Sequence, residues 1–218
     1  MAFLEKVTLF PNQLGPEDLA IPRRAGVSDQ AILDATYVCV GFNIIARIAD
    51  ALGFKIPSED LFVRAAKLLR VFGYRRLSGF WTSGSNKPAG TFATSWTTFD
   101  PHAKKMLRLR YAVLSGPGSL PPHVRQAISE GARLSGALGA FVQKIAADAS
   151  ALTDDDIAEL HRAHYTDDQI FEAIVSAALG AGLFRLERVL GLLRDTSLEN
   201  LDRNPRRQLD SIVIPIGG

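Results

Sequence analysis

Cys39, the only cysteine in this sequence of 218 residues, is the first candidate for chemistry. A thiolate can attack a peroxide, and a second thiol then resolves the sulfenic acid as a disulfide. A single cysteine leaves no internal disulfide and no Cys-rich metal site, which fits a reducing compartment. Cys39 lies between Val38 and Val40, and a thiol in apolar surroundings is inert. The sequence predicts a packing role, with a one-cysteine peroxidase using an external thiol as the alternative.

Two histidines, His161 and His164, have the i, i+3 spacing that places two imidazoles on one face of a helix. Metal binding is conceivable from this pair. However, no third ligand is fixed by the spacing, and cations near the C-terminal end of a helix are favoured by its dipole. We therefore expect a capping or surface role and no metal site.

Two arginines, Arg47 and Arg185, occupy the same position of an internal repeat on otherwise apolar faces. A buried guanidinium must be paired. Asp50 is a candidate partner for Arg47, and Glu187 or a carboxylate on another helix is one for Arg185. The alternative is that both arginines bind an anionic ligand between the two halves.

The repeat that contains these arginines aligns residues 27 to 53 with residues 165 to 191 without a gap, at an offset of 138. Each copy carries apolar residues at helical spacing, which predicts one long helix of roughly 22 to 25 residues with one buried face. Both copies have a hydroxyl N-cap and a glycine suited to the left-handed position after a helix. These are Ser28 and Thr166 at the starts and Gly53 and Gly191 at the ends.

A short helix is expected before each long one, because acidic residues follow a capping residue there. The predicted unit is thus short helix, turn, long helix, and strand signals are nearly absent, so we expect an all-α fold. The remaining expected elements are short helices near 15 to 19 and 153 to 162, helices over 58 to 72, 101 to 115 and 121 to 149 (broken near Gly136 or Gly139), a loop at 83 to 98, and a strand or extended arm at 209 to 216. We expect an N-terminal half over 1–82, a connecting loop over 83–100 and a C-terminal half over 101–218, which form one compact unit.

Composition narrows the function classes. A hydrophobic content of 47% allows a sizeable core. Lys and Arg number 25 against 23 Asp and Glu, so no basic field favours nucleic acid. The start lacks the pattern of a signal peptide. The most apolar stretches, 35 to 46 and 173 to 184, are shorter than the about 20 residues that span a bilayer. We expect a cytoplasmic protein that binds neither nucleic acid nor membrane.

Three segments resemble one known superfamily. They are TDDDIAEL from Thr153, YTDDQIFEAI from Tyr165, and Phe42-Asn43 followed by RIADALG from Arg47. They are similar to the carboxymuconolactone decarboxylase and alkyl hydroperoxidase D (AhpD) superfamily, in its uncharacterised peroxidase-related branch. The resemblance implies an AhpD-like helical fold that assembles into homo-oligomers.

The same resemblance implies lost redox chemistry. In that family a Cys-x-x-Cys followed by His, with an upstream Glu, carries the reaction. The ungapped comparison places Ala137 and Ala140 at the cysteines, Lys144 at the His and Gln126 near the Glu. The expected function is therefore that of a degenerate AhpD-like protein without dithiol peroxidase activity or cofactor, which binds a small hydrophobic or anionic molecule or a partner subunit.

An enzymatic alternative stays open. Decarboxylase-type members of the superfamily work by proton transfer without a cysteine pair, so a carboxylate or imidazole can serve as general acid or base. The candidates are Glu130, His161, His164 and Glu172. A pocket that holds one of them would favour this alternative, whereas a closed core around all four would favour binding.

Overall fold

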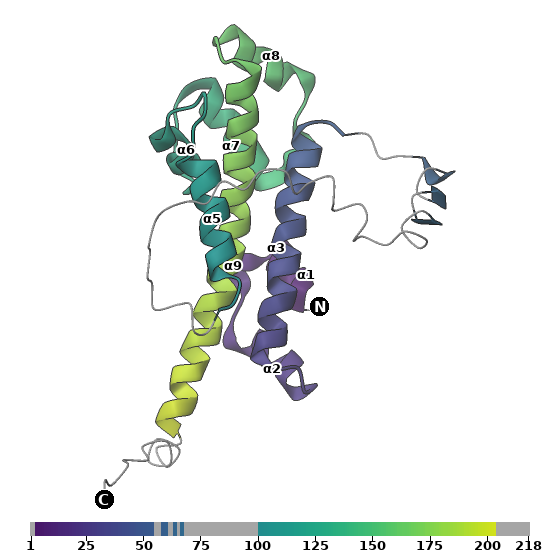
Figure 1. Cartoon of the computed structure of the whole chain (residues 1–218), viewed down its shortest axis with the longest axis vertical. Coiled ribbons are helices and arrows are strands. Elements are labelled where there is room, and N and C mark those ends of the chain that lie inside the picture. The colour runs from purple at the N-terminus through teal and green to yellow at the C-terminus, as the bar shows by residue number, and fades with distance from the viewer. Residues whose placement is uncertain (1–2, 55–57, 61–62, 65, 68–99, 204–218) are drawn as a thin grey trace, which may run out of the picture.

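The computed structural model describes residues 3–54, 58–60, 63–64, 66–67 and 100–203, with side chains up to Asp195 in the last range. Every element in this part of the chain is a helix, which confirms the all-α prediction (Figure 1). The elements are α1 (Phe3–Leu9), the 3-10 turn η1 (Pro11–Gln13), α2 (Pro16–Arg24), α3 (Asp29–Ala51), α5 (Ala103–Leu114), α6 (Pro122–Ser129), α7 (Gly136–Asp148), the 3-10 turn η3 (Ala149–Ala151), α8 (Asp154–Arg162) and α9 (Asp167–Arg203).

The two long helices, α3 and α9, lie side by side in opposite directions and form the centre of the molecule (Figure 1). Both begin at the expected caps. Ser28 Oγ accepts a hydrogen bond from the Ala31 N–H at 3.2 Å. Thr166 Oγ1 accepts one from the Gln169 N–H at 3.3 Å, while the Gln169 side chain accepts one from the Thr166 N–H at 3.1 Å. Gly53 has a φ of 63°, as expected after the end of α3.

Small residues bring the long helices close together. A Cβ at Gly182 of α9 would lie 2.5 Å from Ile44 Cγ1 of α3, and one at Gly180 would meet the backbone of Ser129 in α6. The small-residue stretch of α9 is thus a tight packing face. The resulting core is apolar along its length, from Val7, Leu19 and Leu193 near α2 to Ile145, Leu160 and Ile174 near α8.

The duplication extends well beyond residues 27 to 53. Elements α1, η1, α2 and α3 recur in the same order as α7, η3, α8 and α9, still at an offset of 138. Lys6 Nζ binds Asp18 Oδ2 at 2.7 Å, and the equivalent Lys144 Nζ binds Asp156 Oδ1 at 2.5 Å. We call residues 138 positions apart repeat equivalents.

Each copy also packs its 3-10 turn on the long helix of the other copy. The turn η3 of the second unit packs on α3, and the turn η1 of the first unit packs on α9. Both α2–α3 and α8–α9 connections use a left-handed residue at equivalent places, Gly26 with φ 83° and His164 with φ 65°. The two units are therefore related by an approximate two-fold axis between α3 and α9.

The predicted length of the second long helix is wrong. The second long helix has 37 residues, not 22 to 25, and Gly191 lies inside it. Beyond Gly191, Leu193 is fully buried against the first unit, so continuing the helix buries apolar surface. Beyond Gly53, the sequence instead reaches Pro57, which disfavours helix at the residue before it. The helical segment predicted over 121 to 149 is broken near Gly136, as expected: α6 ends at Ser129 and α7 begins at Gly136.

Several other predictions fall wholly or mostly outside the described residues. The loop at 83 to 98 and the C-terminal arm at 209 to 216 are among them, and only fragments of the helix at 58 to 72 are described.

Among the described residues, two helices are long and apolar enough to cross a membrane by length and composition alone. They are α3, with 33% of its most apolar 18 residues buried in the protein, and residues Asp167–Asp195 of α9, with 67% of the corresponding 18 residues buried. The α9 segment has the burial of a core helix.

Candidate functional site

Cys39 is half-buried between α1 and α3 and packs against the core. Its Sγ lies 3.2 Å from Thr8 Oγ1, and Asn43 Nδ2 donates to it at 3.5 Å. The thiol is thus surrounded by small polar groups on one side, a setting less apolar than its sequence neighbours Val38 and Val40 predicted.

Arg185 is buried close to this cluster. A carboxylate partner, either Glu187 or one on another helix, was expected for it, but its hydrogen bonds go to no carboxylate. Its guanidinium donates to the Thr8 carbonyl at 2.9 and 3.2 Å and to the Ala181 carbonyl at 2.7 Å. It therefore holds the C-terminal end of α1, where a cation is favoured by the helix dipole. Burial, followed by repulsion from Arg47, lowers the pKa of Arg185 to about 10, so it remains a cation at neutral pH.

Arg47, the repeat equivalent of Arg185, is less well paired. Its Nη1 donates to Asn43 Oδ1 at 3.3 Å, whereas its buried Nε has no hydrogen-bond partner. Burial lowers the pKa of Arg47, and the charges of Asp148 and Asp50 oppose that shift. Asp148 and Asp50 thus act on Arg47 only through their charge, and the ion pair expected between Arg47 and Asp50 is not among the described contacts.

The two candidate histidines do not form a metal site. His161 Nδ1 lies 3.2 Å from the Tyr165 carbonyl and its Nε2 lies 3.3 Å from Asp167 Oδ1, while His164 occupies the left-handed turn after α8. Within the described part of the chain, no group of three His, Cys, Asp or Glu side chains is arranged to hold a metal ion.

The two candidate carboxylates have different settings. Glu172 accepts hydrogen bonds from the Ser119 and Leu120 N–H groups at 2.7 Å each, which fastens the loop before α6 to α9. Glu130 lies exposed at the end of α6. The four acid–base candidates therefore do not converge on one cavity.

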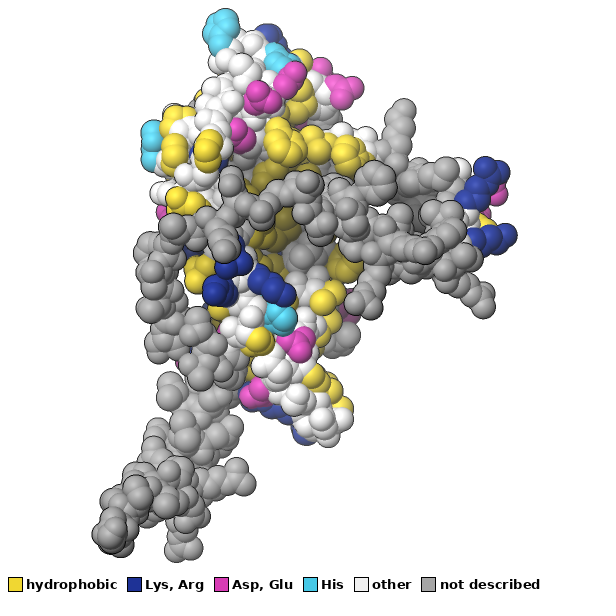
Figure 2. All heavy atoms as spheres, in the orientation of Figure 1, with side chains coloured by type: hydrophobic (Ala, Val, Ile, Leu, Met, Phe, Trp, Pro, Cys, Tyr) yellow, Lys and Arg dark blue, Asp and Glu magenta, His cyan; other side chains and the backbone are white. Residues whose placement is uncertain are grey.

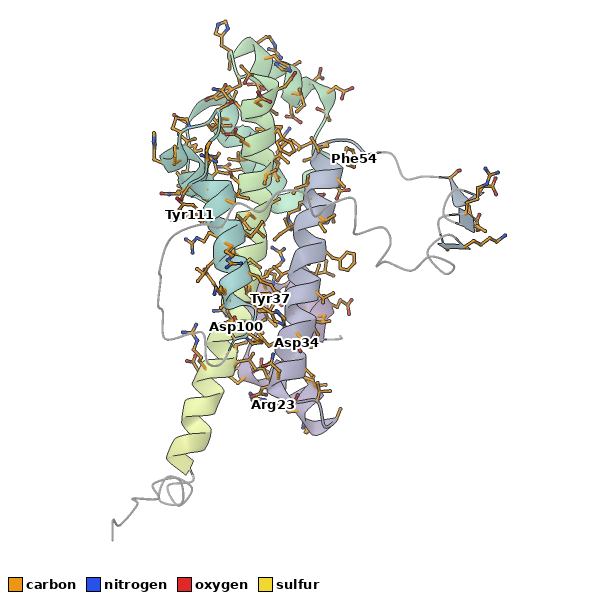
Figure 3. The ribbon with its side chains drawn as sticks, in the orientation of Figure 1. Arg23, Asp34, Tyr37, Phe54, Asp100 and Tyr111 are labelled. Carbon is orange, nitrogen blue, oxygen red and sulfur yellow. The ribbon has the colours of Figure 1, made fainter. Side chains whose placement is uncertain are left out.

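Another cluster of titratable groups joins α3 to α5. Tyr37 donates a hydrogen bond to Asp100, which also accepts from the His102 and Ala103 N–H groups, and His102 Nε2 lies 2.9 Å from Asp34 Oδ1 (Figure 3). Burial and then Asp100 raise the pKa of Tyr37, whereas hydrogen bonds from His102 and Gln30 lower that of Asp34. A phenol with a raised pKa is a poor acid or base at neutral pH, so the cluster anchors α5.

A groove of about 410 Å³ opens where the end of α3 meets the starts of α8 and α9. This volume falls in the range of small-molecule sites, about 300–1,000 Å³. Its floor is apolar, and acidic side chains stand at its edge. The lining residues are Asp50, Ala51, Leu52, Gly53, Leu152, Thr153, Asp154, Ile157, Asp167, Ile170, Phe171 and Ile174.

The charged side chains that line this groove are all acidic. The N-termini of α8 and α9 together contribute about one positive charge. Three lining carboxylates, Asp50, Asp154 and Asp167, outweigh them. Figure 2 shows acidic side chains gathered at the α8 end of the molecule, with exposed apolar side chains below them. The groove therefore suits an apolar molecule that carries a positive charge.

The equivalent place at the α2 end of the molecule is closed. There α9 continues past Gly191, so that Leu193 packs against Leu14, Leu19 and Leu33. Arg188, the repeat equivalent of Asp50, donates to the Pro11 carbonyl at 3.4 Å and to the Leu14 carbonyl at 3.2 Å. The apolar equivalents of the groove floor, among them Leu14, Leu19 and Leu33, are buried at this end.

The exposed fractions of equivalent side chains differ between the groove end and the α2 end of the molecule. Phe171 in the groove is 50% exposed, whereas its repeat equivalent Leu33 is 0% exposed. Phe54, just past the end of α3, is 69% exposed and lies at the groove end of that helix (Figure 3).

None of the sequence-predicted site residues lines the groove, and its own residues were not among the candidates. A signal was present in the repeat, since the exchange of Asp50 for Arg188 and the proline after Gly53 mark where the copies diverge.

Comparison with known proteins adds no relative: no family model matches the chain, and no curated protein or solved structure does either.

Proposed function

We propose that this protein is a degenerate member of the AhpD-like, carboxymuconolactone decarboxylase-like superfamily that binds a small apolar cation in the groove between α3, α8 and α9. The observation that carries the proposal is the open groove itself, because the same structural unit is filled at its other end. The absence of a second cysteine from the sequence removes dithiol peroxidase chemistry. The single thiol also favours a cytoplasmic location.

The charge of the groove lining determines which class of ligand the groove can bind. An anionic ligand was one expectation, resting on Arg47 and Arg185, but neither lines the groove. The carboxylates of Asp50, Asp154 and Asp167 would repel an anion and attract an ammonium group. The apolar floor, with Ile157 and Phe171 among its residues, would bury a short alkyl or aromatic portion.

Calorimetric titration tests this proposal with octyltrimethylammonium and octanoate, whose alkyl tails of eight and seven carbons are nearly equal in length and whose charges are opposite. We expect the cation to bind more tightly than the anion by about tenfold or more. Asp154→Asn with Asp167→Asn should remove most of that preference.

A matched control is available in the same helical turns. Asp155→Asn with Asp168→Asn removes the same charge from residues outside the groove lining. The control should keep the cation preference. Octanoate binding as tightly as the cation, or equal losses in both double variants, would contradict the proposal.

A one-cysteine peroxidase is the second candidate, favoured by the polar groups around Cys39. The Thr8 hydroxyl and the Asn43 amide could donate to a thiolate. Its sulfur would attack the O–O bond of a hydroperoxide, giving a sulfenic acid and an alcohol, and an external dithiol would reduce the sulfenic acid. Hydroperoxide consumption with excess dithiol that vanishes in Cys39→Ser would support this activity. No turnover in either protein would exclude it.

The proton-transfer enzyme has weaker support. Glu172 uses both carboxylate oxygens to hold the loop before α6, and His161, His164 and Glu130 lie outside the groove lining. A general acid or base must reach the substrate by a hydrogen bond. Substitution of Glu130, His164 and Glu172 is expected to leave ligand binding unchanged, whereas His161 lies beside Asp167 of the groove.

A further inference from the structure

Helix α3 carries an exposed apolar seam on the side that faces away from the core. Val38 is 61% exposed, Phe42 69% and Ile45 63%. The core side of the same helix, with Ile32, Val40 and Ile44 among its residues, is buried. The seam continues in both directions with smaller or partly exposed apolar residues. Its members are Ala31, Ala35, Val38, Phe42, Ile45, Ala49 and Leu52.

The spacing of the seam is that of a helix prepared to pair with another helix. Successive members are separated alternately by three and four residues, counting from Ala35 through Leu52. This is the a/d repeat of coiled coils, in which each seam residue packs against a facing helix. Residues needed only for the monomer's core would occupy one face of α3, whereas here a second apolar face is present.

The repeat shows how this face is used elsewhere in the molecule. On α9, the equivalents of Val38 and Phe42 are Ser176, which is fully buried, and Gly180, which lies against the backbone of Ser129 in α6. Helices α5 and α6 pack on α9. The same face of the structural unit is thus covered by helices in the second copy and is uncovered among the described residues of the first.

We propose that a second copy of this chain covers the seam, with the two α3 helices packed antiparallel about a two-fold axis. In the register that gives every large seam residue a partner in the other seam, Phe42 faces Ile45 of the second copy and Val38 faces its Ala49. Ala35 then faces Leu52 of the second copy. Large residues thus meet small ones at both ends of the seam, and the two largest meet in the middle.

Charge and shape favour a second copy over a membrane surface. Asp34 and Asp50 flank the seam without belonging to it, and the net charge of +2 gives little repulsion between copies. Membrane-surface helices are rich in Lys and Arg on their polar face. Helix α3 contains no Lys and a single Arg, Arg47, against three Asp residues.

The test is the mass of the full chain in solution, measured by light scattering after size exclusion over a range of concentrations. Wild type is expected at twice the chain mass of 23.7 kDa. Phe42→Lys and Ile45→Glu each place a charge in the seam and should weaken the dimer by about thirtyfold or more. Ile21→Lys, at an exposed apolar residue of α2, is the matched control and should remain dimeric.

Mixing the two seam variants tests the antiparallel register. In a mixed dimer the new ammonium group faces the new carboxylate, and the other side of the seam keeps its native pair. An equimolar mixture should therefore regain the dimer mass. Circular dichroism on each variant checks that the helices persist, as the high exposure of both sites predicts.

Three outcomes would overturn the proposal. The first is that the wild type has the monomer mass at every concentration, whether or not it floats with phosphatidylcholine vesicles. The second is persistence of the dimer in both seam variants. The third is a mixture that stays monomeric, which would contradict the antiparallel pairing.

Discussion

The α2 end and the α8 end of this molecule are built from the same unit and are finished differently. At the α2 end, α9 runs past Gly191 and buries Leu193 in the first unit's core. At the α8 end, α3 stops at Ala51, and the corresponding space is an open groove. The two ends of the duplicated fold thus differ because α9 continues past Gly191 whereas α3 ends at Ala51.

The outer faces of the two long helices also differ in whether other helices cover them. The outer face of α9 is covered by α5 and α6, whereas that of α3 displays Val38, Phe42 and Ile45. The two open places, one at an end and one along a side, are the two interaction sites proposed for the chain.

The largest expected effect is at the closed end. Leu193→Ala should lower the free energy of unfolding by about 3 kcal/mol, because it removes a fully buried side chain and leaves a cavity. Phe54→Ala, at the equivalent of Leu192 and 69% exposed, should change it by about 0.5 kcal/mol or less. Urea unfolding measures both. Equal losses would mean that the groove end is packed as tightly as the closed end.

A smaller effect is expected at the repeat equivalents Gly53 and Gly191. Gly53 follows the end of α3, whereas Gly191 lies inside α9. Gly53→Ala should cost about 1 kcal/mol because φ is +63° there. Gly191→Ala should instead stabilise the protein by up to about 1 kcal/mol, since the residue lies inside α9 and an added Cβ meets nothing within 4 Å. Thermal unfolding gives the signs, and a shared sign would show that the helices end alike.

The smallest effect concerns the repeated ion pairs. Burial raises the pKa of Asp18, but hydrogen bonds from Lys6 and the Gly15 N–H outweigh it and leave the pKa lowered; a hydrogen bond from Lys144 is the main cause of the lowered pKa of Asp156. Each pair therefore stabilises the fold fully above the ordinary aspartate pKa of 3.8 and loses its effect as the pH falls through the lowered value.

Asp18→Asn and Asp156→Asn should each cost about 1 kcal/mol or less at neutral pH. The difference from wild type should close as the pH falls below 3.8. Asp18→Asn should cost more, because the Lys6 side chain is 20% exposed and that of Lys144 is 47% exposed. Urea unfolding at several pH values checks this, and a difference that widens in acid would refute it.

The sequence predicted the helices and half of the duplication, because caps and helical periodicity are local signals. Ser28, Thr166 and Gly53 behave as expected. The rest of the repeat was readable at the same offset, in matches such as Lys6 with Lys144 and Asp18 with Asp156. The length of α9 was missed because Gly191 looks like a helix end unless the burial of Leu193 against distant residues is known.

The groove could not be predicted from residue types that carry chemistry. Its floor consists of ordinary core residues, such as the half-buried Ile157 and the buried Ile170, and it opens where α3 ends. The candidates chosen for chemistry, Arg185 and Glu172, instead hold backbone groups of neighbouring segments.

The most direct test of the open and closed ends is to map amide chemical shifts of the full chain as octyltrimethylammonium is added. Our account predicts that shifts concentrate at Leu52, Thr153 and Phe171, while their repeat equivalents Leu190, Gly15 and Leu33 stay unchanged. Equal shifts at both ends, or shifts confined to the α3 seam, would contradict the claim that the groove is the binding site.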